Sequence, residues 1–335
     1  MRKRVIFRAD GNSQIGLGHI VRCCALAEML KGDFEIVFVT VSPSESVKQL
    51  VEGVSNRIIK LTEKDGSVFF ESIEKTDIVI LDGYTFDSEY QKKIKDEGCK
   101  LICIDDLHSI HFVSDVVINQ SASVSAKDYS IEPYTKLYLG FDYALLRTPF
   151  LIAAKIKRQI ESVNTAFVSM GGADSNNVSS KVIEAIIQSG RFKRINVLLG
   201  SANKNIELIK KFSSNNNCSI KLYIDLNEDE VCETINNSDV AFCPASSIAI
   251  ECCAVGIPLF VGFTADNQRG ILRTLVEKGA ALNVGNWNEL DSSNIASKIN
   301  ECDFNIDFFY SIIDGQKKLI DGKSGSRLLE IVKAL

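Results

Sequence analysis

The chain has 335 residues, a length that suggests two domains at roughly 150 residues each. It carries 38 Lys and Arg against 43 Asp and Glu, a formal net charge of −5. This balance argues against a nucleic-acid backbone or an anionic membrane as the main partner, because both attract basic surfaces. Apolar residues make up 45% and charged residues 24% of the chain, a composition that excludes a disordered protein.

The sequence gives no sign of a membrane span, a signal peptide or a metal site. No stretch approaches the roughly 18 apolar residues that a span requires. An uninterrupted run of only three apolar residues, 5–7, precedes Arg8 and Asp10, whereas a signal peptide has an apolar core of roughly 7–15. The 10 cysteines form no CxxC pair, which argues against zinc and against a disulfide framework. We therefore expect a cytoplasmic protein without a metal.

Short β-branched runs alternate with amphipathic stretches through the first half of the chain. The predicted strands are 5–10, 34–40, 57–61, 77–82 and 100–106. The predicted helices are 18–31, 44–53 and 87–97. Uniformly apolar strands are typical of a sheet that is buried on both faces, and the alternation predicts a parallel, doubly wound sheet.

The same alternation restarts after residues 138–150 and 153–164, which we predict to be a linker. Strands are predicted to begin at residues 165, 194, 219, 239 and 257. Helices are predicted at 176–189, at 203–213, at 228–237 and from 246. The predicted fold class is α/β, with two Rossmann-like doubly wound domains, 1–150 and 151–320, that face a cleft. Residues 321–335 are predicted to be a helix that packs back on the first domain.

A polar, glycine-bearing loop joins the first strand, which ends at Asp10, to a helix that opens at Gly18. Gly16 and Gly18 would let a ligand approach the backbone closely, and a helix N-terminus suits an anion such as a diphosphate. Because position 21 is Val, the complete GxGxxG pattern of dinucleotide-binding proteins is not met.

His19 would lie at the start of this helix, one turn before Arg22. The helix dipole and the Arg22 charge both oppose a second proton, so the position favours a neutral imidazole. Such a ring can take a proton from water, and Asp10 could orient it. A capping or packing histidine is the alternative.

Polar residues also follow other strands of the first half. Asp82 and Tyr84 lie at one strand end, where the tyrosine could stack on a sugar or a base, although the motif alone favours a turn with a buried tyrosine. Asn119 closes another strand and could face the cleft. Asp105, Asp106 and His108 resemble a metal cluster, but adjacent strand side chains point to opposite faces, so we favour a structural role.

Two segments of the second half predict anion binding. Gly171 and Gly172 lie between a strand and a helix, in a turn that can hold a phosphate or simply reverse the chain, and Asp174 and Ser175 are candidate helix caps. Further along, Ser246 and Ser247 follow a strand and can cap the next helix, whose N-terminus suits an anion.

That second segment extends to polar groups that could bind a nucleotide sugar. Glu251, one turn into the helix, could accept hydrogen bonds from two ribose hydroxyls. Asn267 and Gln268, in the loop ADNQ, could contact polar groups of the substrate with their amides. The segment therefore favours nucleotide-sugar binding over a purely structural acid.

Together these motifs resemble the UDP-sugar hydrolases of the pseudaminic acid pathway, which are related to the GT-B glycosyltransferases. The matching motifs, between about residues 4 and 275, are RAD…IGLGH, LDGY, IDDL, VIN, LLRTPF, SMGGAD and SS…E…GIP…ADNQ. The segment RADGNSQ departs from the family, which has a more serine-rich loop. The resemblance implies a GT-B fold and metal-independent hydrolysis of UDP-2,4-diacetamido-2,4,6-trideoxy-β-L-altropyranose to UDP and free sugar.

The resemblance also implies roles for residues: His19 as the catalytic histidine, Tyr84 and Asn267 beside the sugar, and the second domain as the main holder of UDP. The predicted catalytic residues are His19 and Asp10. The predicted substrate-binding residues are Gly16, Gly18, Arg22, Tyr84, Asn119, Asn267 and Gln268. The predicted UDP-binding residues are Gly171, Gly172, Ser246, Ser247 and Glu251.

We expect a monomer that acts on a small UDP-sugar without a cofactor and without nucleic-acid or membrane partners. Two alternatives stay open. One is a GT-B glycosyltransferase that uses a UDP-amino-sugar donor. The other is a non-catalytic nucleotide-sugar-binding protein.

Overall fold

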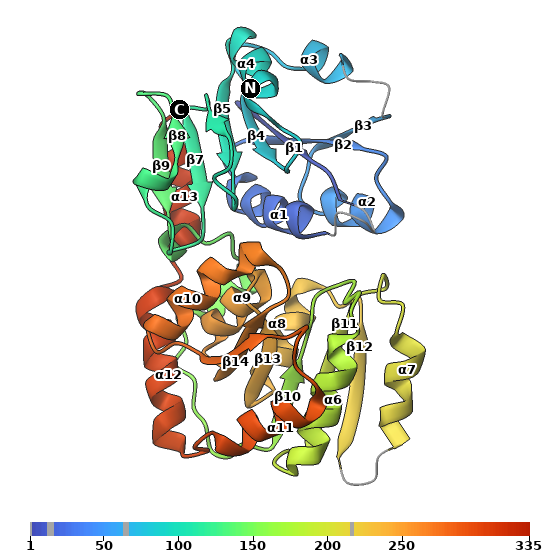
Figure 1. Ribbon diagram of the computed structural model, residues 1–335. Helices are drawn as coiled ribbons and strands as arrows, with labels where there is room; N and C mark the ends of the chain where they lie inside the picture. The colour runs from blue at the N-terminus through green and yellow to red at the C-terminus, as the bar shows by residue number, and fades with distance from the viewer. Residues whose placement is uncertain (1, 12–16, 63–66, 215–217) are drawn as a thin grey trace. The chain divides into compact units, whose positions relative to one another are not determined.

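The computed structural model describes residues 2–11, 17–62, 67–214 and 218–335 (Figure 1). The chain divides into two compact units, the first formed by Met1–Thr148 with Lys323–Leu335 and the second by Pro149–Gly322. Within the described ranges, none of the helices is long and apolar enough to cross a membrane.

Unit 1 is built on a seven-stranded parallel sheet with the order β3-β2-β1-β4-β5-β7-β9. Its strands are β1 (Arg4–Ala9), β2 (Glu35–Val41), β3 (Arg57–Leu61), β4 (Ile78–Asp82), β5 (Lys100–Ile104), β7 (Val116–Asn119) and β9 (Lys136–Leu139). Its helices are α1 (Gly18–Leu30), α2 (Glu45–Glu52), α3 (Val68–Ser72), α4 (Ser88–Asp96) and α13 (Ser324–Lys333). A small pair, β6 (His111–Phe112) and β8 (Ser130–Ile131), and the 3-10 turns η1 (Ala126–Asp128) and η2 (Phe141–Tyr143) complete the unit.

Both faces of this sheet are covered by helices (Figure 1). Side chains of α1, α2 and α13 share one core with Phe7, whereas side chains of α3 and α4 share the other core with Ile6. The neighbouring residues Ile6 and Phe7 serve opposite faces because strand side chains alternate. Burial on both faces explains why the central strands are uniformly apolar.

Residues 138–150 were predicted to be linker, and this prediction is wrong for part of the range. Strand β9 (Lys136–Leu139) pairs in parallel with β7 and forms the edge of the sheet. Its residues are at most half-buried, so the strand lacks the apolar run by which the central strands are found. Helix α5 (Thr148–Ala153) follows, with Phe150 fully buried.

Unit 2 repeats the architecture with a six-stranded parallel sheet of order β12-β11-β10-β13-β14-β15. Its strands are β10 (Thr165–Val168), β11 (Arg194–Leu199), β12 (Ser219–Ile224), β13 (Val240–Pro244), β14 (Leu259–Phe263) and β15 (Leu282–Asn286). Its further helices are α6 (Val178–Ser189), α7 (Ile206–Lys210), α8 (Glu228–Asn236), α9 (Ser247–Val255), α10 (Arg269–Glu277), α11 (Ser292–Glu301) and α12 (Ile306–Leu319). Its 3-10 turns are η3 (Lys211–Ser214) and η4 (Asp266–Gln268).

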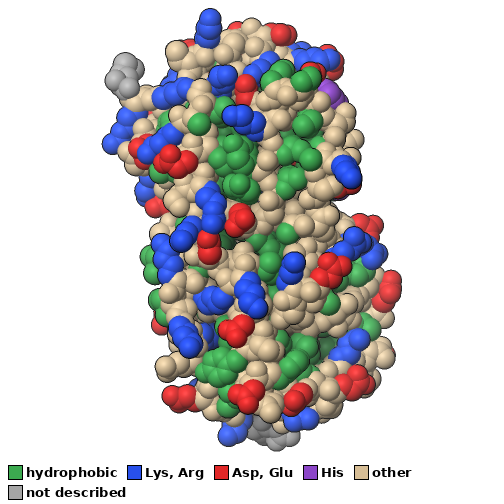
Figure 2. Space-filling model, turned by 90° about the vertical axis from the view of Figure 1, so that its left-hand side faces the viewer, with side chains coloured by type: hydrophobic (Ala, Val, Ile, Leu, Met, Phe, Trp, Pro, Cys, Tyr) green, Lys and Arg blue, Asp and Glu red, His purple; other side chains and the backbone are tan. Residues whose placement is uncertain are grey.

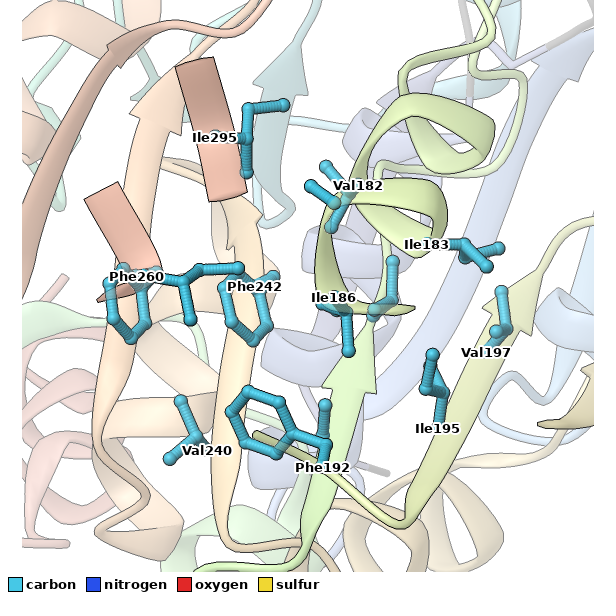
Figure 3. Close-up of a cluster of buried hydrophobic side chains, with 14 of the residues drawn as sticks. Val182, Ile183, Ile186, Phe192, Ile195, Val197, Val240, Phe242, Phe260 and Ile295 are labelled. Carbon is cyan, nitrogen blue, oxygen red and sulfur yellow. The ribbon is translucent and has the colours of Figure 1, made fainter. Parts of the chain in front are cut away.

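The core of unit 2 is aliphatic and aromatic. Figure 3 shows side chains of α6, β11, β13 and β14 gathered in one cluster. Within it, the rings of Phe242 and Phe260 stack with their centroids 4.8 Å apart. Helix α7 begins later than predicted because Asn203 accepts a hydrogen bond from the amide of Asn205 and holds a turn there.

The surface carries charges of both signs. On the face shown in Figure 2, Lys and Arg side chains are interspersed with Asp and Glu, in keeping with the formal net charge of −5. The ten cysteines are all free thiols.

Candidate active site

Three neighbouring strands of unit 1 bring polar residues together at their carboxyl ends. In the sheet, β1 lies beside β4 and β4 beside β5, and Asp82 is in register with Ala9 on one side and with Ile104 on the other. Helix α1 starts close to the end of β1. Ligands of doubly wound sheets bind at this edge, so the residues gathered here form the candidate active site.

His19 pairs with Asp82 at this edge. Its ring nitrogen Nδ1 lies 2.7 Å from Asp82 Oδ1, and the side chains are 7% and 0% exposed. Because an ionised carboxylate can only accept, we assign the proton of this contact to Nδ1, which also lies 3.1 Å from Arg22 Nη2. In the neutral ring the lone pair that can take a proton is therefore on Nε2.

Arg22 holds Asp82 in its ionised form. Its guanidinium donates from Nε to Oδ2 and from Nη2 to Oδ1, both at 2.5 Å. Burial on its own would raise the pKa of Asp82, but the charge and hydrogen bonds of Arg22, together with His19, lower it below the ordinary value. The same carboxylate raises the pKa of Arg22 in spite of burial.

Arg22, which is predicted to bind substrate, makes a further contact within the protein. Its guanidinium also donates from Nη1 to Asp106 Oδ2 at 3.1 Å, and the residue is 8% exposed. With two carboxylates bound, Arg22 is placed to orient the His19–Asp82 pair, and its contact with substrate stays a prediction.

Tyr84 covers the His19 ring. The two rings meet edge to face with centroids 4.8 Å apart at 83°, and the Tyr84 hydroxyl donates to Asp106 Oδ2 at 3.1 Å. The residue is 56% exposed, so the interpretation as a buried turn tyrosine is wrong. Asp106, which was assigned a structural role from the sequence, links Tyr84 to Arg22.

The other polar residues at this edge are bound to neighbouring backbone or side chains. Asp10 accepts from Arg8 Nη1 at 2.6 Å and from the amide of Val41 at 2.7 Å, which ties β1 to β2. Asn119 is fully buried, donates to the Tyr129 hydroxyl at 2.8 Å and accepts from an amide at 2.7 Å. Asp10 and Asn119 thus have local structural partners, and we do not carry them into the proposed site.

Asp105 supports the loop that carries Asp106. It accepts from the amides of Leu107 and His108 and, at 2.8 Å, from the Tyr129 hydroxyl. These bonds agree with the structural role predicted for Asp105. Among the residues that the structure describes, no group of three or more His, Cys, Asp and Glu could hold a metal ion.

The glycines of the first loop are only partly described. Gly16 lies outside the described residues. Gly18 is the first residue of α1, and a Cβ atom added to it would meet nothing within 4 Å. This leaves open space beside the backbone at the helix start, as close approach of a ligand requires.

In unit 2, Gly171 and Gly172 lie between β10 and α6, as predicted. Gly171 has φ +89°, a conformation that favours glycine. A Cβ on Gly200 would lie 2.7 Å from the Gly172 carbonyl oxygen, so two loops meet backbone to backbone here. Asp174 accepts from the amides of Val178 and Ser179 at 2.8 and 2.9 Å, which confirms its capping role and occupies two donors of α6.

Ser246, Ser247 and Glu251 lie on the start of α9. Ser246 is its N-cap residue, as predicted, although within this fully described helix its side chain makes no capping hydrogen bond. Glu251 lies one turn further on and is 5% exposed.

Asn267 and Gln268 belong to the short turn η4 after β14. Gln268 Oε1 accepts from the amide of Thr264 at 2.8 Å, whereas Asn267 is exposed. Asn288, which the sequence did not single out, donates to the Thr264 carbonyl at 3.0 Å and accepts from Asn176 at 2.9 Å. It joins the loop after β14 to the loop before α6.

Known proteins resemble this chain along most of its length, although no family model matches it. A Campylobacter jejuni protein named UDP-2,4-diacetamido-2,4,6-trideoxy-beta-L-altropyranose hydrolase is 29% identical over 82% of this chain and 97% of its own. The Bacillus subtilis spore coat polysaccharide biosynthesis protein SpsG is 26% identical over 98% of this chain and 97% of its own. An uncharacterized Methanocaldococcus jannaschii protein is 26% identical over 79% of this chain, which spans 57% of that relative.

Solved structures agree with the predicted fold class. MurG from Acinetobacter baumannii superposes with a TM-score of 0.69 at 12% identity and covers 99% of this chain and 100% of its own. The S. aureus MnaA–UDP structure gives a TM-score of 0.67 at 11% identity, over 99% and 96%. The chain therefore has a GT-B-like fold of two Rossmann-like units, and the resemblance drawn from its motifs is confirmed.

Proposed function

We propose that this chain hydrolyses a UDP-linked diacetamido-trideoxy sugar to UDP and the free sugar. Its similarity to the named Campylobacter jejuni hydrolase supports an enzyme that acts on a nucleotide sugar. The observation that carries the proposal is the His19–Asp82 contact of 2.7 Å, because it prepares an imidazole with its Nε2 available to take a proton from water.

In the proposed reaction, water attacks the anomeric carbon of the sugar. His19 Nε2 takes one proton of that water as the new C–O bond forms. The bond from the anomeric carbon to the phosphate oxygen breaks, and its electron pair leaves with UDP. Asp82, kept ionised by Arg22, stabilises the imidazolium that forms, as a buried carboxylate does in other histidine pairs.

The nucleotide would be held by unit 2. The backbone at Gly171–Gly172 and the start of α9 at Ser246 and Ser247 would bind the diphosphate, and the helix dipole would stabilise the charge that develops on UDP without a metal. Glu251 would accept hydrogen bonds from the two ribose hydroxyls. Around the sugar we propose Gly18, Tyr84, Asn267 and Gln268.

The test incubates the protein with UDP-2,4-diacetamido-2,4,6-trideoxy-β-L-altropyranose in buffer that holds no acceptor. We expect UDP and free sugar to form in equal amounts, as measured by mass spectrometry. Addition of a chelator should not lower the rate. A glycosyltransferase, the second candidate because GT-B transferases are among the structural neighbours, would need an acceptor for comparable turnover. Binding of UDP without turnover of any UDP-sugar would contradict both enzymatic functions.

The proposed ribose contact predicts that Glu251→Gln, which keeps the shape of this buried side chain, weakens the binding of UDP. A hydrogen bond to a charged acceptor contributes about 1.5–3 kcal/mol, so UDP should bind roughly 10- to 100-fold more weakly. Calorimetry with UDP and with 2′-deoxy-UDP shows whether the weaker binding comes from the lost ribose contact. The wild type should prefer UDP, and the variant should bind both alike; an undiminished preference in the variant would show that Glu251 does not hold the ribose.

A further inference from the structure

A small pocket in unit 1 has Tyr84 in its lining. It is formed at the ends of β4 and β5 and by the loop that follows β5, and its members include Tyr84, Leu107 and Ser109. Tyr84 and Leu107 are 56% and 38% exposed and Ser109 is exposed, so these three form the rim. Tyr84 is shared, since its ring also meets the His19 ring at 4.8 Å.

The floor of the pocket is apolar. Leu81, Phe86, Cys103 and Phe112 contribute to it and are each at most 6% exposed. Burial raises the pKa of the Cys103 thiol to about 12, so the thiol stays neutral and adds apolar surface. An apolar floor of this kind favours an alkyl group over a hydroxyl or a charge.

Two polar members of the lining are already bound within the protein. Gln91 donates to the Phe86 carbonyl and accepts from the amide of Val113. Asp105 accepts from two loop amides and from Tyr129. The rim hydroxyl of Ser109 is therefore the polar group best placed to meet a ligand at the mouth.

The size of the pocket restricts its occupant. Its cavity volume is about 40 Å³, and one water needs roughly 10–15 Å³, so the space fits about three non-hydrogen atoms. An acetyl group has three non-hydrogen atoms. Its methyl group would contact the apolar floor, and its carbonyl oxygen would lie at the mouth.

The geometry points to this pocket as the subsite for the acetyl group of one acetamido substituent of the sugar, with Tyr84 as the residue that both lines the pocket and contacts the catalytic imidazole. This assignment rests on the proposed function and adds to it a determinant of specificity: a nucleotide sugar whose amino group is acetylated is accepted, and its free-amine counterpart is not.

Filling the pocket tests the assignment. Ser109→Phe places a ring at the mouth, and Lys127→Phe places the same ring at an exposed position of unit 1 that does not line the pocket. The readout is the ratio of kcat/KM for UDP-2,4-diacetamido-2,4,6-trideoxy-β-L-altropyranose to that for its 2,4-diamino analogue. A small apolar group in a fitted pocket gives roughly 10- to 100-fold discrimination.

We expect the wild type and Lys127→Phe to prefer the diacetamido compound over its diamino analogue. In Ser109→Phe we expect the ratio to be near one and the affinity for UDP to be unchanged. An equal preference in all three proteins would overturn the subsite while leaving the hydrolase intact.

A second arm keeps the subsite testable if the wild type hydrolyses neither compound. Saturation-transfer NMR with free 2,4-diacetamido-2,4,6-trideoxy-L-altrose reports directly on the acetyl methyl groups. Transfer in the wild type and in Lys127→Phe, and its loss in Ser109→Phe, supports the subsite even when the proposed hydrolysis fails. Absence of transfer in the wild type, or equal transfer in Ser109→Phe, overturns it.

Discussion

His19→Ala should reduce kcat for UDP-sugar hydrolysis by roughly 10²- to 10⁴-fold, the usual contribution of general-base catalysis. The loss is expected because Nε2 is the nitrogen left to take the proton of water once Nδ1 donates to Asp82. The affinity for UDP should stay within about twofold, because the residues proposed to hold UDP belong to unit 2. Steady-state kinetics and UDP titration measure the two effects separately.

Two further variants distinguish a base from a packing histidine, the alternative left open by the sequence. His19→Gln can still donate to Asp82 but cannot take up a proton, so it should be as inactive as His19→Ala. His111→Ala makes the same change at a half-exposed histidine of unit 1, whose ring contacts Ser130 and Glu132, and should retain activity. Wild-type turnover in His19→Gln would refute the general-base role.

The central strands could be predicted from the sequence because both of their faces are buried. Strands such as β4, with every residue buried, are continuous apolar runs and are found by composition alone. The edge strand β9 and the partly exposed β15 have mixed patterns, and their place depends on pairing with a neighbour that local sequence does not specify. Strands β9 and β15 are therefore determined by tertiary structure, whereas the edge strands β3 and β12 could be predicted from their own sequence.

The residues of the candidate site could be predicted from the sequence, but the contacts between them could not. The loop-to-helix pattern led to His19, and the position after a strand led to Asp82 and Tyr84. That Asp82 contacts His19 depends on β4 lying beside β1, although the chain places two other strands between them. The usual strand order of doubly wound sheets could have suggested this neighbourhood, and with it the role of Asp106 at the end of β5.

The second large effect is expected when the buried carboxylate of Asp82 is replaced. Asp82→Asn should lower kcat by roughly 10³- to 10⁴-fold, because an amide can donate to Nδ1 and so move the ring proton to Nε2, where it blocks proton uptake. The UDP affinity should not change. The variant should also lose stability, by up to about 3–5 kcal/mol, since the buried Arg22 loses one of its two carboxylates and keeps only the contact with Asp106.

The stability loss has a pH signature that follows from the lowered pKa of Asp82. The contribution of an acid with a lowered pKa is fully present above its ordinary value, near 3.9, and is lost as pH falls through the lowered one. The advantage of the wild type over Asp82→Asn in urea unfolding should thus be full at pH 7 and shrink below about pH 4.

A double variant separates positioning from stability. Asp82→Asn with Arg22→Gln removes both charges of the buried pair, so it should recover most of the lost unfolding free energy. It should not recover kcat, because the carboxylate that fixes the proton on Nδ1 is still missing. If instead activity returned together with stability, Asp82 and Arg22 would be structural partners only, and the orientation of His19 would have to come from another contact.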